Sequence, residues 1–181
     1  MNPLSAFWLS RRQAKARALI HSSTVLDIGS RTEKLREDEV TLDIERSVRP
    51  DICASAEALP FRDGSFDYIV MLEVIEHLND AQLHSALREC KRVAHSAIFS
   101  TPNCDSAIWD KVVWPLWSHT IGREWIGAHK QFFGKASLAK LLEGTHGMKI
   151  LERNYSHWNL LVLVSTRAGG PSGLAGAPPV A

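Results

Sequence analysis

The residues best placed for chemistry in this sequence follow an apolar stretch in the middle of the chain. Residues 66–72, FDYIVML, are almost continuously apolar and include β-branched and aromatic members, which is typical of a strand buried on both faces of a parallel sheet. Glu73 and His77 come soon after this stretch. We therefore expect them at the carboxyl edge of the sheet, where open α/β sheets bind their ligands.

Glu73 and His77 are four residues apart, so in a helical turn they share a face. An imidazole has an ordinary pKa of about 6.5, so His77 is a candidate base for a hydroxyl or amine acceptor. The alternative is a histidine that packs and hydrogen-bonds locally at the start of a helix. Glu73 is a candidate for contacting a cofactor or an acceptor at the same edge.

Two further strand ends carry candidate ligand-binding residues. Residues 40–44 predict a second strand that ends in Asp43, and a carboxylate at such a place can accept both hydroxyls of a ribose. The alternative for Asp43 is a solvated residue at a strand end. Gly29 follows a first strand at residues 24–29, where a glycine allows a ligand to approach the backbone, although a tight turn alone also requires one.

Three sequence segments together resemble a known family. VLDIG at 25–29, AEALPF at 56–61 and DGSFDYIVMLEVIEHL at 63–78 resemble the class I S-adenosylmethionine-dependent methyltransferases, in particular the small bacterial branch called methyltransferase type 11. The resemblance covers residues 24–164. It implies S-adenosyl-L-methionine as cofactor and methyl transfer to a small or lipid/sugar-linked acceptor.

The resemblance also implies a role for individual residues. His129 precedes a late helix, where this branch often has a histidine facing the cleft, so it joins His77 as a catalytic candidate. The sequence departs from the family pattern at Arg31 and Glu33, which replace glycines, and at Ser55, which replaces an acidic residue on the adenine side. The implied cofactor-binding residues are Asp27, Gly29, Ser30, Asp43, Ile44, Ser55, Ala56, Glu57, Leu72 and Glu73. For Glu57 the alternative is a solvent-facing loop residue.

The expected fold is a single α/β domain with a Rossmann-like methyltransferase fold. It has a mostly parallel seven-stranded sheet with helices on both faces, and the resemblance adds one antiparallel strand near an edge. The expected parts of the chain are an N-terminal helix (1–22), the methyltransferase domain (23–167) with a tryptophan-rich acceptor-side segment (108–133), and a disordered Gly/Pro/Ala tail (168–181).

The hydrophobic patterns place the remaining elements. They predict a helix at 3–20, a short strand at 51–54, an amphipathic helix at 79–94 and a strand at 96–100. A short helix at 136–143 is expected to stop at Gly144 and Gly147, before an antiparallel pair at 148–152 and 160–166. The connection from 29 to 43 leaves room for a helix of about two turns at most, and none is expected at 45–50.

Composition narrows the class of protein. The chain has 181 residues, 45% of them apolar, and a net charge of +1, which gives no bulk attraction to nucleic acid. The three cysteines are predicted to be reduced, mostly buried thiols of a cytoplasmic protein, and no membrane span is expected. None of the eight histidines has H-x-x-x-H spacing and no C-x-x-C is present, so we predict no metal site.

The tryptophan-rich segment contains Trp109, Trp114, Trp117 and Trp125. Indoles combine an apolar body with an N–H donor, so we predict that this segment forms the acceptor-side wall, is partly exposed in the monomer, and is a candidate homodimer contact. The alternative is ordinary core packing.

The sequence leaves other classes of function to consider. A non-catalytic methyltransferase-like binding or regulatory subunit is suggested by the degenerate glycine motif and the short first crossover. A nicotinamide-dependent oxidoreductase needs G-x-G-x-x-G, which is absent, and a Ser/His/Asp hydrolase lacks its G-x-S-x-G turn.

Overall fold

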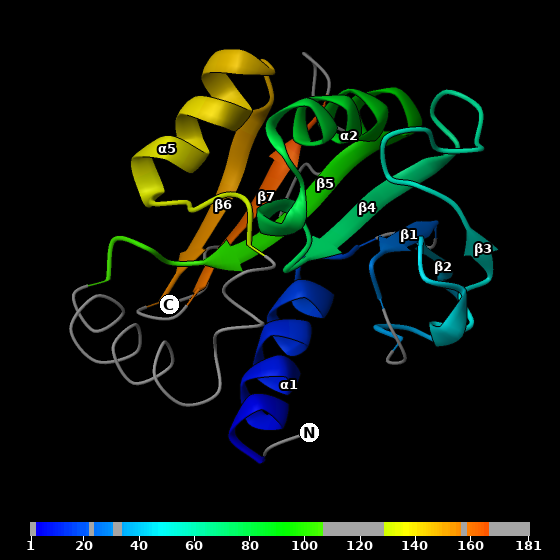
Figure 1. Ribbon diagram of the computed structural model, residues 1–181, viewed down its shortest axis with the longest axis horizontal. Coiled ribbons are helices and arrows are strands. Elements are labelled where there is room, and N and C mark those ends of the chain that lie inside the picture. Colours follow the sequence, from blue (N-terminus) through cyan, green and yellow to red (C-terminus); the bar gives the residue numbers. More distant parts are fainter. Residues whose placement is uncertain (1–2, 22–23, 31–33, 107–128, 157–158, 167–181) are drawn as a thin grey trace.

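The computed structural model describes residues 3–21, 24–30, 34–106, 129–156 and 159–166. These form one seven-stranded sheet in the order β3-β2-β1-β4-β5-β7-β6 (Figure 1). Strands β1 to β5 pair in parallel, whereas β7 is antiparallel to both β5 and β6. The strands are β1 (Val25–Ile28), β2 (Val40–Asp43), β3 (Ile52–Cys53), β4 (Phe66–Leu72), β5 (Ala94–Pro102), β6 (Lys149–Tyr155) and β7 (Asn159–Ser165). The predicted mostly parallel sheet with one antiparallel strand near its edge is confirmed.

The strand order reverses between β1 and β4, and this reversal positions the site. The chain runs outward from β1 through β2 to β3, and then returns to β4 on the other side of β1. In such sheets the crevice at the carboxyl ends of the two central strands is where ligands bind. β1 and β4 pair through Val25–Tyr68, Leu26–Ile69 and Asp27–Val70, so their carboxyl ends are neighbours.

The long helices are α1 (Pro3–Ala18) and α2 (Asp80–Val93), and α5 (Lys135–Ala139) continues into a π-helical segment, η4 (Lys140–Thr145). α2 begins where the sequence predicts, because Asn79 accepts a hydrogen bond from the Gln82 N–H while the Gln82 side chain accepts from the Asn79 N–H. Single 3₁₀ turns form at η1 (Arg46–Val48) and η2 (Ile75–His77).

Two hydrophobic clusters divide the core between the two faces of the sheet. Ile69 and Met71 of β4 belong to the cluster that contains Leu83 and Leu87 of α2 and Leu138 of α5. The alternate β4 residues, Tyr68 and Val70, belong to the other cluster, with Ala16 in the last turn of α1 and Leu19 and Ile20 just after it. Helices therefore cover both faces, as predicted. Figure 1 shows α1 extending away from the sheet beyond the ends of β4 and β5.

Several local predictions need correction. The late helix does not stop at Gly144, because η4 runs through it to Thr145, and the reversal comes at Gly147, whose φ of 61° suits a glycine. β5 extends to Pro102 rather than ending at residue 100. The segment 45–50 contains the 3₁₀ turn η1, although no helix was expected there. The described residues between β1 and β2 form turns, consistent with the shortened crossover.

The cysteines are free, but the prediction that most are buried is wrong. Only Cys90 is buried, whereas Cys53 on the edge strand β3 is exposed and Cys104 is half-buried. Burial raises the pKa of the Cys90 thiol to about 12, so this side chain is a core residue rather than a nucleophile.

Some expectations lie outside the described residues. These include the tail at 168–181, most of the tryptophan-rich segment, and Arg31 and Glu33 of the turn after β1. Within the described ranges, no helix combines the length and apolar character required to cross a bilayer.

Candidate functional site

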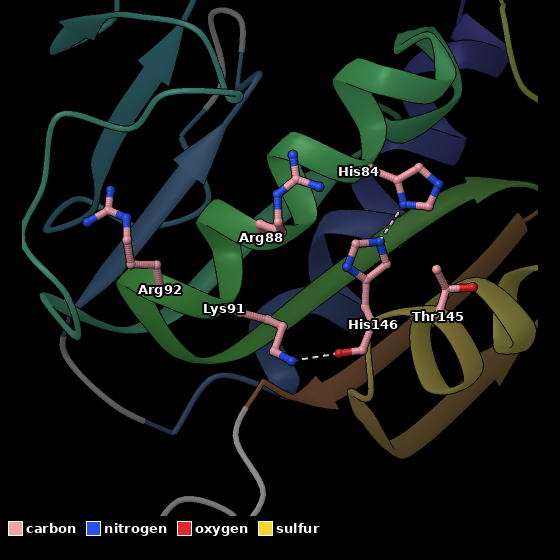
Figure 2. A pocket seen from close by; sticks show the side chains of 6 residues that line it. All are labelled: His84, Arg88, Lys91, Arg92, Thr145 and His146. Atoms are coloured by element: carbon pink, nitrogen blue, oxygen red, sulfur yellow. Dashed lines mark hydrogen bonds between the residues drawn. The ribbon is translucent and has the colours of Figure 1, made fainter.

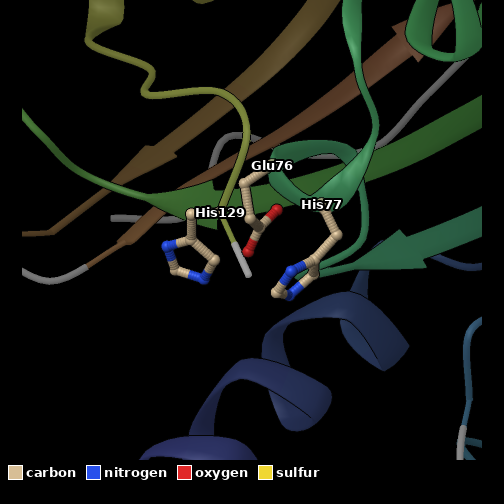
Figure 3. A group of neighbouring side chains, drawn as sticks. All are labelled: Glu76, His77 and His129. Atoms are coloured by element: carbon tan, nitrogen blue, oxygen red, sulfur yellow. The ribbon is translucent and has the colours of Figure 1, made fainter. Parts of the chain in front are cut away.

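The structure brings four histidines together in two pairs at separate places. His84 and His146 meet at a pocket on the outer face of α2, which we call the outer pocket (Figure 2); it is lined by His84, Arg88, Lys91, Arg92, Thr145 and His146. His77 and His129 meet beside Glu76, and we call these three residues the edge cluster (Figure 3). The edge cluster contains both histidines that the sequence predicts to be catalytic.

Backbone hydrogen bonds hold the edge cluster together. Glu76 and His77 lie on η2, which follows the carboxyl end of β4. The Glu76 carbonyl accepts hydrogen bonds from the N–H groups of Lys130 (2.8 Å) and Gln131 (3.0 Å), which brings His129 alongside η2. The rings of His77 and His129 have centroids 4.7 Å apart, and one ligand-type atom from each of the three side chains lies within 4.8 Å of the others.

Glu76 is a buried carboxyl group with only partial compensation. Its exposed fraction is 1%, and neither side-chain oxygen has a hydrogen-bond partner of normal geometry. Burial, and after it the neighbouring Glu73 carboxylate, raises the pKa of Glu76 well above its ordinary value, and its own N–H, Arg12 and Thr101 offset only part of that rise. A buried carboxyl group with no hydrogen bond is costly for a fold, which makes it a candidate for binding a ligand or a proton.

His129 is held in its neutral form. Its exposed fraction is 8%, and burial, followed by the nearby His77, lowers the pKa of His129 from 6.5 to about 4. At neutral pH the ring therefore carries no charge. A neutral imidazole is the form that accepts a proton or coordinates a metal ion.

Glu73 does not share a face with His77, so that part of the prediction is wrong. Its backbone is left-handed, with φ of 58°, and the helical turn begins only at Ile75. The Glu73 carboxylate pairs with Arg12 of α1 at 3.1 Å and accepts hydrogen bonds from Ser100 Oγ (3.0 Å) and Asn159 Nδ2 (2.6 Å). Glu73 thus connects β4 to α1, β5 and β7.

In the turn after β1, the backbone of Gly29 lies close to the Val74 side chain. Gly29 has φ of 77°, and a Cβ built there would lie 2.6 Å from Val74 Cγ2. Its neighbour Ser30 has a buried Oγ without a hydrogen-bond partner, so the turn presents an unused polar atom. Asp27 is buried, and its pKa is raised well above normal by burial, then by Glu39 and Asp43.

The predicted adenosine-side residues lie at the ends of β2, β3 and β4. Asp43 is half-buried and accepts a hydrogen bond from the Glu45 N–H at 2.9 Å, while the apolar Ile44 beside it is 74% exposed. Ser55, Ala56 and Leu72 are half-buried. Glu57 is half-buried and its Oε1 accepts from Gln82 Nε2 at 2.7 Å, so it is tied to α2 rather than facing solvent alone.

The structure therefore places the predicted residues at the carboxyl ends of four neighbouring parallel strands, with the edge cluster next to β4. Sequence reasoning did not single out Glu76. The prediction of no metal site tested only short spacings, whereas the three side chains come from positions 76, 77 and 129. The sequence did indicate this cluster in part, because His77 and His129 were both predicted to be catalytic.

A family model described as methyltransferase domain matches residues 10–97. Comparison with curated protein sequences gave no match.

Similar solved structures support the same fold. They include the PH0226 protein from Pyrococcus horikoshii OT3, with 14% identity, a TM-score of 0.66, and coverage of 91% of this chain and 92% of that one. A Thermotoga maritima protein described as a possible histamine N-methyltransferase has 15% identity, a TM-score of 0.65, and coverage of 91% and 95%. YcgJ from Bacillus subtilis has 12% identity, a TM-score of 0.65, and coverage of 88% and 100%.

The sheet order and the binding edge define a Rossmann-like α/β protein of the type that binds a nucleoside cofactor. Together with this fold, the match of residues 10–97 to a methyltransferase-domain model supports a class I S-adenosylmethionine-dependent methyltransferase.

Proposed function

We propose that this methyltransferase transfers the methyl group of S-adenosylmethionine to a hydroxyl oxygen of a small or lipid/sugar-linked acceptor, and that the edge cluster takes up the proton of that hydroxyl. The observation that carries this proposal is the meeting of Glu76, His77 and His129 at the carboxyl end of β4. A sulfonium methyl needs no activation by the protein, whereas a hydroxyl is a poor nucleophile until its proton is taken up.

The residues around the turn after β1 fit the cofactor. Gly29 and Ser30 Oγ would hold its amino-acid part, and Asp43 would accept its ribose hydroxyls. Ile44 would pack on the adenine, with Ser55 and Ala56 at its edge. When bound, the cofactor supplies the methyl group that moves from sulfur to oxygen.

The proton would pass from the acceptor hydroxyl to an imidazole of the edge cluster as the carbon–oxygen bond forms. His129 is neutral at pH 7, so its ring can accept a hydrogen bond from the hydroxyl, but its lowered pKa makes it a weak base. We therefore assign the uptake of the proton to His77. The edge cluster would contribute mainly by orienting the hydroxyl, an effect that can cover roughly 7–11 kcal/mol of a barrier when geometry is well defined.

A second form of the same site is a divalent cation held by the edge cluster. Two imidazoles and a carboxylate are a common ligand set for zinc, iron and manganese, and the three ligand atoms already lie within 4.8 Å of one another. A bound cation would also provide the partner that both Glu76 oxygens lack. Such an ion supplies a Lewis acid beside the acceptor hydroxyl.

Cofactor binding is tested with S-adenosylhomocysteine by calorimetry. We expect micromolar affinity, about −8 kcal/mol, and a loss of at least tenfold in Asp43→Ala, because the ribose loses its acceptor. Glu152→Ala, an exposed carboxylate on β6, is the matched control and should bind normally. If the unmodified protein does not bind the probe, the non-catalytic binding subunit becomes the better account.

The proton and cation roles are separated by metal titration and activity. Release of S-adenosylhomocysteine is measured with panels of phenols, sugars and lipid-linked sugars, before and after EDTA treatment. Cobalt(II) should give visible absorption bands in the unmodified protein that are lost in Glu76→Gln and His129→Gln but retained in His21→Gln, an exposed histidine outside the cluster. Activity that survives EDTA supports the imidazole base, and activity that disappears and returns with metal supports the cation. Activity unaffected by His77→Gln and His129→Gln would contradict both roles.

A further inference from the structure

The outer pocket has a volume of about 580 Å³ and lies between α2 and the turn that follows η4 (Figure 2). His84, Arg88 and Lys91 are spaced i, i+4 and i+7, so they share the face of α2 that is turned away from the core residues Leu83 and Leu87. His146 approaches from the other side, and its Nε2 lies 2.7 Å from His84 Nδ1. None of the lining residues belongs to the edge cluster or to the cofactor-binding set.

The pocket carries uncompensated positive charge. Within the described part of the chain, no carboxylate lies within ion-pair distance of Arg88 or Lys91. Arg92 differs, because Glu89 (2.7 Å) and Asp63 (2.9 Å) pair with it, so it serves as part of the wall. Among the described residues, the carboxylate in ion-pair distance of His84 is that of the exposed Asp80, at 3.7 Å.

His146 lies close to these cations. Burial lowers the pKa of His146, and interactions with its neighbours His84, Lys91 and Arg88 lower it further. A bound anion would raise the pKa of His146, because a negative charge favours the protonated form that nearby cations disfavour.

Unused hydrogen-bond donors complement the charge. Arg88 donates to Ser85 Oγ at 2.9 Å, and Lys91 donates to the His146 carbonyl at 2.6 Å, which leaves most of the N–H groups of both side chains available. The rings of the histidine pair are stacked, with centroids 5.0 Å apart, and they lie to one side of these two cations (Figure 2). Donors that surround a hollow from two elements match a compact anion with several acceptor oxygens.

We propose that the outer pocket binds a small molecule through a phosphate group. The volume falls within the range of small-molecule pockets, roughly 300–1,000 Å³. A long polyanion is a poorer match, because binding along a nucleic-acid backbone uses about six or more phosphate contacts. Here two uncompensated cations face one hollow, and the chain as a whole carries a net charge of only +1.

The probe for this site is inorganic pyrophosphate, with the unmodified full chain. Calorimetry should show saturable binding, and the imidazole NMR signals of His84 and His146 should shift with the same dissociation constant. Arg88→Gln combined with Lys91→Gln should weaken binding at least tenfold, whereas Arg46→Gln, an exposed arginine on η1, should not. Arg88→Gln alone should weaken binding severalfold, and it leaves the Lys91 bond to His146 intact.

Three results would overturn the proposal: absence of saturable binding, equal affinity in the double variant, or shifts that spare both histidines. Vesicles containing anionic lipid form a separate arm, and binding to vesicles without binding to pyrophosphate would also contradict a small-molecule site. Binding of S-adenosylhomocysteine should be unchanged in the double variant, so failure here is distinct from failure of the methyl-transfer proposal.

Discussion

The two histidine pairs of this protein show how the neighbours of an imidazole pair decide what it can bind. In the edge cluster, the rings of His77 and His129 meet edge to face beside a buried carboxyl group. In the outer pocket, His84 and His146 stack and share a hydrogen bond beside Arg88 and Lys91. The first set attracts a proton or a cation, and the second attracts an anion.

The pKa of His129 gives the largest expected effect. Because its folded pKa lies at about 4 rather than 6.5, the unfolded chain takes up a proton first as pH falls, so stability is lost between pH 6.5 and 4. At about 1.4 kcal/mol per pKa unit, a pKa difference of about 2.5 corresponds to about 3.5 kcal/mol, of which about 3 kcal/mol is lost by pH 4. Urea unfolding in EDTA at pH 7, 5.5 and 4 should show this loss in the unmodified protein and not in His129→Gln. An equal loss in both would place the titration elsewhere.

Glu76 should act in the opposite direction. Its pKa is raised, so the folded state keeps its proton longer, and stability falls as pH rises from the ordinary value of 4.5 through the raised one. Glu76→Gln cannot ionise and should be more stable than the unmodified protein at pH 8, by about 1–2 kcal/mol, and nearly equal to it at pH 4.5. The comparison again uses urea unfolding in EDTA, and a variant that is less stable at pH 8 would show that Glu76 has a structural partner.

A smaller effect is expected at Arg88. Removing its charge in Arg88→Gln should raise the pKa of His146 only part of the way towards its ordinary value, since burial remains the first cause of the lowered value. An NMR titration of the His146 ring measures this directly. Lys149→Gln is a suitable control, because Lys149 is close in sequence but does not line the pocket. A pKa that falls or does not move would contradict the electrostatic account of the outer pocket.

The smallest effect is expected at Asp80, which is 85% exposed and 3.7 Å from His84. Exposed pairs contribute about 0–1 kcal/mol, so Asp80→Asn should leave stability almost unchanged. It should strengthen pyrophosphate binding by less than threefold, because one negative charge leaves the rim. Calorimetry detects such a change, and a larger gain would mean that Asp80 limits the pocket more than its exposure suggests.

The sequence predicts the sheet well because its signal is local. β4 is an unbroken apolar run, and α2 combines a capping residue with a periodic apolar face, so both follow from short stretches of sequence. The same logic places Asp43 and Gly29 at strand ends. It fails where backbone geometry departs from the regular pattern, as at the left-handed Glu73 and at the π-helical turn through Gly144.

The two histidine sites were less accessible to sequence reasoning because their members are distant in the chain. His129 reaches η2 through hydrogen bonds to the Glu76 carbonyl, and His146 reaches His84 across 62 positions. His77 and His129 were predicted singly, from strand position and resemblance. The outer pocket had no such support, since cations spaced along α2 have the pattern of a solvated helix face.

The contacts of the Glu73 carboxylate with Arg12, Ser100 and Asn159 affect the order in which the protein folds during synthesis. One carboxylate joins Arg12 near the start of the chain to Asn159 near the end of the described residues. A ribosome-bound chain that stops before β7 therefore lacks one of the partners that fix the strand exit beside the edge cluster. We expect nascent chains truncated before residue 159 to leave this exit unprotected in hydrogen-exchange measurements, and protection at Glu73 in such chains would contradict a late closure.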